Sequence, residues 1–116
     1  MFPKKNRITK REFSELMKTG RVFHSPIFLF RMVKKEQGTL PKFAFVVSKK
    51  VAKNAADRNK MKRRGFHALR EVVFPIDPKM GGCMCAFFFK KEGREVGFEE
   101  IKREIKELLK KGGILQ

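Results

Sequence analysis

Positive side chains are concentrated in residues 48–70 of this 116-residue chain. Residues 49–70 contain nine Lys or Arg and a single acidic residue, Asp57. Like charges one helical turn apart destabilise a helix by about 0.2–0.5 kcal/mol per pair, so an isolated, solvated helix gains nothing from this pattern. Phosphate contacts would offset the cost, because each neutralised phosphate releases condensed counterions. The segment therefore predicts a polyanion-binding surface, and the alternative is a merely solvated basic face.

The side chains of this segment combine two ways of holding a phosphate. Arg grips phosphate with two parallel hydrogen bonds, whereas Lys acts as a mobile point charge. Asn59 adds a neutral donor and acceptor, which suits a sugar or a base edge. The candidate RNA-binding residues are Lys49, Lys50, Arg58, Asn59, Lys60, Lys62, Arg63 and Arg64.

Catalysis by this chain alone is not predicted. The sequence has no Ser-His-Asp or Cys-His arrangement, no carboxylate cluster for Mg²⁺ and no glycine-rich phosphate loop. His67 is a lone histidine on a polar helix face. Cys83 and Cys85 share one face of a predicted strand, where so short a ring disfavours a disulfide, and no metal-type spacing supplies further zinc ligands. We therefore expect two buried thiols, no catalytic residue and no metal ligand.

The composition agrees with a polyanionic partner. A formal net charge of +17 and a pI near 10.4 oppose compactness through self-repulsion. A solubilising surface, the alternative, needs a charge of only about 2–8. The apolar share of 41% and thirteen Phe are enough for a core, and with no Trp or Tyr any base stacking must use Phe, His or Arg. No apolar run approaches the ~20 residues of a membrane span, and no signal peptide is recognisable, so a cytoplasmic location is expected.

Local patterns predict the elements that carry these residues. Thr9 and Glu12 form a capping box, and Ile8 and Phe13 occupy the staple positions of a first helix. Gly20 is expected to end that helix in the left-handed conformation.

Apolar runs predict the remaining elements. We expect strands at residues 22–24, 27–33 and 43–48, with the latter two paired as a hairpin, and a further strand at 83–89. A second helix capped by Asn54 or Asp57 ends before Pro75, a turn occupies 78–82, and a last helix runs over 98–111. The prediction is one compact α+β domain over residues 1–116, in the order helix, three strands, helix, strand, helix.

Two separated motifs resemble a known family. VSKKV at residues 47–51 is followed after a short spacer by RNKMKR at 58–63, and KNRIT at 5–9 precedes Phe13 and Gly20. In this order the motifs resemble the protein subunit of bacterial ribonuclease P, from about residue 4 to 109. The resemblance covers the strand-end SKK and the RNR helix, with Lys60 in place of the last Arg.

The resemblance implies a four-stranded sheet packed by helices, with a left-handed β-α-β crossover through the second helix. It also implies that a catalytic RNA subunit, requiring Mg²⁺, removes the 5′ leader of precursor tRNA. The protein would bind that RNA through the basic helix, making the catalytic RNA and the precursor its partners, with no membrane and no obligate protein partner. The alternatives are a ribosomal or general structured-RNA-binding protein, and a protein-only nuclease.

The resemblance further implies a cleft for the single-stranded leader between the first helix and the sheet. Phe13 would be its first aromatic, and Met17 stands one turn later where the family often has a second. On the long strand, Phe30 or Arg31 would complete the cleft, since a guanidinium plane also stacks on bases.

Overall fold

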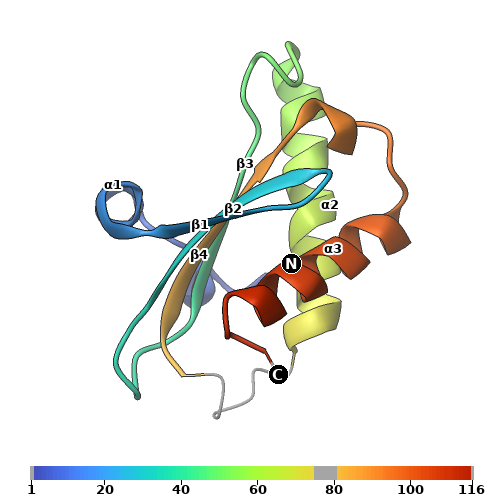
Figure 1. Ribbon diagram of the computed structural model, residues 1–116. Helices are drawn as coiled ribbons and strands as arrows, with labels where there is room; N and C mark the ends of the chain where they lie inside the picture. Colours follow the sequence, from blue (N-terminus) through green and yellow to red (C-terminus); the bar gives the residue numbers. More distant parts are fainter. Residues whose placement is uncertain (1, 75–80, 116) are drawn as a thin grey trace.

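Within the described residues, 2–74 and 81–115, the computed structural model contains one four-stranded mixed sheet between two layers of helices (Figure 1). The strand order is β1-β2-β4-β3. The strands are β1 (Arg21–His24), β2 (Phe28–Lys34), β3 (Lys42–Val46) and β4 (Cys83–Phe89). One face is covered by α2 (Ala55–Val73) and α3 (Phe98–Lys111), and the other by α1 (Lys10–Thr19). Short 3₁₀ helices are η1 (Lys4–Asn6) and η3 (Lys91–Gly93).

The α+β prediction is confirmed, but the predicted hairpin between residues 27–33 and 43–48 is wrong. β4 lies between β2 and β3, antiparallel to β2 and parallel to β3. The burial of β2 alternates, whereas every residue of β4 except Phe88 is buried, so β4 is the strand best suited to a central position. Phe28 still approaches Phe45, with ring centroids 6.2 Å apart, because both strands flank β4.

Parallel pairing of β3 and β4 requires a crossover, and α2 provides it. The left hand of this crossover stays a prediction. Asn54 is the N-cap of α2: its Oδ1 accepts from the Ala56 N–H at 2.7 Å, which decides between the two predicted caps. Pro75 and most of the turn predicted at 78–82 lie outside the described residues.

The main core lies between the sheet and the α2–α3 layer. It contains a cluster of Phe rings, including Phe45 and Phe87 stacked at 5.0 Å. Cys83 and Cys85 are fully buried in this core, which confirms their predicted packing role. Burial raises the pKa of the Cys85 thiol well above its usual value, so that thiol stays protonated. At Gly65, a Cβ would lie 2.6 Å from the Phe45 ring, so glycine lets α2 approach the sheet closely.

The predicted capping box of α1 is confirmed. The Thr9 hydroxyl accepts from the Glu12 N–H at 3.3 Å, and the Glu12 carboxylate accepts from the Thr9 N–H at 2.9 Å. The left-handed ending predicted at Gly20 is wrong, because its φ of −70° and ψ of 146° are extended. Glycine is needed there for space: a Cβ would lie 2.6 Å from Cγ of Arg31.

Candidate RNA interface

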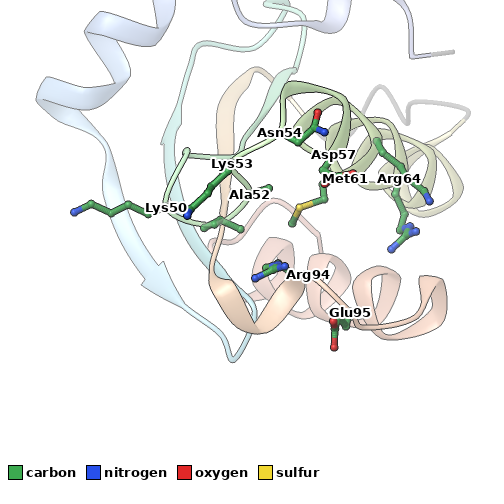
Figure 2. Close-up of a pocket in the computed structure, with 11 residues that line it drawn as sticks. Lys50, Ala52, Lys53, Asn54, Asp57, Met61, Arg64, Arg94 and Glu95 are labelled. Carbon is green, nitrogen blue, oxygen red and sulfur yellow. The ribbon is translucent and has the colours of Figure 1, made fainter.

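A basic hollow of about 480 Å³ opens where the loop of residues 47–54 meets the first turns of α2 and the segment after η3 (Figure 2). Its five cations outnumber its two carboxylates, Asp57 and Glu95. Cations gathered in a concave surface focus a positive potential, which suits a phosphate backbone. The basic hollow is lined by Lys50, Val51, Ala52, Lys53, Asn54, Asp57, Lys60, Met61, Arg64, Arg94 and Glu95.

Arg94 is a hollow residue that the sequence motifs did not predict. It follows η3, about thirty positions after Arg64, and lies across the hollow from Lys53 and Asn54 (Figure 2). No pattern around Arg94 distinguishes it from other charged loop residues. The fold alone brings it to the basic helix.

Arg58 organises the loop that leads into α2. Its Nη1 donates to the carbonyl oxygens of Ala52 and Lys53, at 2.9 and 2.7 Å. The Val51 and Ala52 N–H groups both donate to the Ser48 carbonyl at 3.1 Å, which closes the preceding turn. Part of the Arg58 guanidinium is thus used within the protein, and its first role is to position the loop of the hollow.

The other predicted cations of α2 face two ways. Lys60 is exposed, Arg64 is half-buried, and both line the hollow. Arg63 is exposed on the other flank of the helix, beside Phe66. Three predicted residues line neither the hollow nor the cavity beside Phe66. Of these, Lys49 and Asn59 are exposed and Lys62 is half-buried.

A second candidate surface lies on the α1 face of the sheet. The strand register places His24, Leu29, Phe88 and Val46 in one row across all four strands. Phe13 of α1 packs beside this row, its ring centroid 5.9 Å from that of Phe88, and both rings are half-buried. We call Phe13 and this row the Phe13 surface. The row lies near the strand ends that lead into residues 47–54 and η3, so the Phe13 surface and the hollow occupy the same end of the sheet.

The structure corrects one predicted cleft residue. Phe30 is fully buried on the opposite face, stacked on Phe87 at 4.7 Å, because alternate residues of a strand point to opposite sides. Arg31 is on the α1 face, but its Nη1 donates to the carbonyls of Met17 and Gly20, both at 3.4 Å. Met17 is 42% exposed. Phe88, which sequence reasoning missed, supplies the second aromatic of this surface.

Comparison with known proteins decides the family. The ribonuclease P family model matches residues 2–113. A ribonuclease P protein component of Rippkaea orientalis is 30% identical, over 97% of this chain and 91% of its own length. The chain belongs to the ribonuclease P protein family. A Listeria welshimeri member is 28% identical, over 97% of this chain and 92% of its own length.

Solved structures of the family share the fold. The Staphylococcus aureus RNase P protein superposes with a TM-score of 0.73 at 18% identity, covering 96% of this chain and 98% of that one. The Thermotoga maritima protein also gives 0.73, at 23% identity, covering 90% and 96%.

Within residues 2–74 and 81–115, no three His, Cys, Asp or Glu side chains are grouped closely enough to hold a metal ion. None of the helices in these residues combines the length and the apolar character of a membrane span.

Burial raises the pKa of the Glu12 carboxyl, but hydrogen bonds from Lys42 and Thr9 outweigh the effect of burial, and the pKa lies below its usual value. The Lys42 Nζ lies 2.6 Å from Oε2 of Glu12, which ties α1 to β3.

Proposed function

We propose that this chain is the protein subunit of a cytoplasmic ribonuclease P ribonucleoprotein and assists removal of the 5′ leader from precursor tRNA. The observation that carries the proposal is the placement of the basic hollow and the Phe13 surface at one end of the sheet, in a chain of this family. Hydrolysis is assigned to the RNA subunit, which would require Mg²⁺. This chain supplies binding and orientation.

The basic hollow would bind the catalytic RNA. Its cations come from the loop of residues 47–54, from α2 and from the segment after η3, so they surround a concave surface. Each phosphate held there releases counterions, and the affinity must therefore fall as salt rises. Asn54 caps α2 and Arg58 holds the loop, so the cations are positioned before the RNA arrives.

The Phe13 surface would hold the single-stranded leader. Stacking of a base on an aromatic ring is worth about 1–3 kcal/mol and tolerates any base, which suits leaders of different sequence. Phe13 and Phe88 offer two rings, and Leu29 and Val46 add half-buried apolar area in the same row.

The alternative, a ribosomal or general RNA-binding protein, is not favoured, because the family match spans nearly the whole chain. A reconstitution assay tests the proposed function. At low Mg²⁺, the protein should raise the rate at which a bacterial ribonuclease P RNA cleaves precursor tRNA. The protein without RNA should cleave nothing; cleavage by RNase-free protein alone would instead support a protein-only nuclease. No stimulation at any Mg²⁺ concentration would contradict the proposal.

A further inference from the structure

A second cavity, of about 600 Å³, lies on the other flank of α2, away from the basic hollow and the Phe13 surface. The N-terminal segment forms one wall, and the second half of α2 forms the other. Three phenylalanine rings and three guanidinium groups line it, together with His67 and Glu71: Phe2, Phe66, Phe74, Arg7, Arg63 and Arg70. We call this cavity the aromatic pocket.

The rings of the aromatic pocket are held from behind. Phe2 is 3% exposed, and its centroid lies 5.3 Å from those of both Phe66 and Phe74. Phe66 packs edge-on against Phe45 of the core at 4.9 Å. Phe66 and Phe74 are nevertheless only half-buried, so the pocket presents apolar ring surface whose position the core fixes.

Two of the three cations of the pocket lie over these rings. The guanidinium carbon of Arg7 is 5.3 Å from the Phe66 ring centroid, and that of Arg70 is 5.6 Å from the Phe74 ring centroid. The Arg7 Nε is buried without a hydrogen-bond partner among the described residues, and an unpaired buried donor of this kind costs free energy. Arg63 is exposed at the edge of the pocket.

The pocket has too little negative charge to bind a cationic partner. Glu71 is its one carboxylate, and Oε1 of Glu71 lies 3.1 Å from Nζ of Lys102. The occupant should therefore be anionic and should carry a flat apolar group. Unpaired nucleotides of RNA have both features, and proteins recognise them by stacking the base on aromatic rings and guanidinium planes.

We propose that the aromatic pocket holds the base of an unpaired nucleotide of the catalytic RNA, with its phosphate at Arg63. This inference rests on the proposed function. In it, α2 contacts the RNA on two sides: one flank binds phosphates at the basic hollow, and the other binds one unstacked base. The base gives the RNA–protein complex a defined register that charge alone cannot provide.

Chemical probing of base accessibility in a bacterial ribonuclease P RNA tests the proposal. Precursor tRNA is omitted, so no leader occupies the Phe13 surface. The natural protein should protect one or more unpaired bases. Phe66→Leu keeps an apolar side chain but removes the flat ring. The protein concentration needed for half-maximal protection of the base should then rise at least about fivefold. Phe74→Leu, at the end of α2, should act in the same direction and does not depend on the contact with Phe45.

Phe23→Leu is the matched control, since Phe23 is a half-buried ring of β1 that packs on Phe30 and lines neither pocket. Backbone probing of the same samples separates the two proposals. Backbone protection with no base sensitive to Phe66→Leu would overturn the pocket assignment alone, whereas a complete absence of protection with the natural protein would overturn the proposed function. Equal losses of base protection in Phe66→Leu and Phe23→Leu would also overturn the assignment.

Discussion

Side-chain direction in β4 separates the core from the candidate interface at single-residue resolution. Phe87 and Phe89 are buried beneath α2 and α3, whereas Phe88 between them is half-buried on the α1 face. Three consecutive rings therefore have two different roles. Phe88 belongs with Phe13, which it contacts, and not with its sequence neighbours.

Replacing Phe88 with Leu should weaken binding of the leader. Leu retains apolar contact with Phe13 but offers no flat face, so leader-bearing precursor should lose affinity by up to about 1–3 kcal/mol per stacked base. Phe13→Leu should give a similar loss. Affinities of the reconstituted ribonucleoprotein for precursor and for mature tRNA provide the measurement. Equal losses for both RNAs would show that the Phe13 surface does not contact the leader.

Glu104 is an acidic residue with a structural role. It is 2% exposed, and its Oε1 accepts from the Ile27 N–H at 3.1 Å, which ties α3 to the segment before β2. Glu104→Leu leaves that N–H without an acceptor and should lower the free energy of unfolding by about 1–3 kcal/mol. Glu104→Gln keeps an acceptor and should unfold at a higher urea concentration than the Leu variant. A Leu variant as stable as the Gln variant would mean that the hydrogen bond contributes nothing.

At the scale of elements, variants of Arg58 and Lys60 distinguish two roles, since Arg58 positions the loop of residues 47–54 and Lys60 is proposed to contact RNA. Arg58→Ala removes the donors to Ala52 and Lys53, so hydrogen exchange should accelerate at the Val51 and Ala52 amides. Lys60→Ala should leave that exchange unchanged. Both variants should bind the catalytic RNA more weakly, but only Lys60→Ala should reduce the slope of log affinity against log salt, by about 0.7–0.9 if one phosphate is no longer neutralised. If Lys60→Ala had the same slope as the natural protein, Lys60 would not contact a phosphate of the RNA.

The position of α1 depends on a carboxylate whose pKa is lowered on folding. The Glu12 pKa lies below its ordinary value of 4.5, so the unfolded chain binds this proton more readily than the folded protein. The stabilisation from Glu12 is therefore present above pH 4.5 and is lost as the pH falls through the lower folded pKa. Glu12→Gln should be less stable than the natural protein at neutral pH, and the difference should shrink in acid. A difference that is constant with pH in urea titrations would exclude this linkage.

At the scale of the whole molecule, local chemistry is predictable from the sequence and long-range pairing is not. Thr9, Glu12 and Asn54 are recognisable as caps because a cap acts within a few residues. The position of β4 depends on which apolar strand gains most from burial on both faces, and several strands in this chain are apolar. For the same reason the prediction for Phe30 chose the wrong face: in a strand without polar alternation, neither parity identifies the core side.

The candidate site divides in the same way. The cations of α2 stand in one contiguous motif, and their clustering identifies them. Arg94 and Phe88 join the interface only through the fold, since η3 returns toward the start of α2 and β4 is inserted between β2 and β3. Composition predicts that the molecule binds a polyanion, but it does not predict where the basic hollow, the Phe13 surface and the aromatic pocket lie on the fold.

Placement of charge, and not its total, should determine RNA affinity. Lys53→Glu combined with Lys60→Glu changes the net charge by as much as Lys106→Glu combined with Lys110→Glu, and the latter pair is exposed on α3 outside both pockets. Reversal in the basic hollow should weaken binding to the catalytic RNA strongly and flatten its salt dependence by about 0.7–0.9 for each phosphate that the hollow no longer binds. Reversal on α3 should reduce mainly the association rate at low salt, because it alters only the long-range field. If titrations over a range of salt concentrations gave the same decrease in affinity for both pairs, the hollow would be one part of a uniformly basic surface and not a docking site.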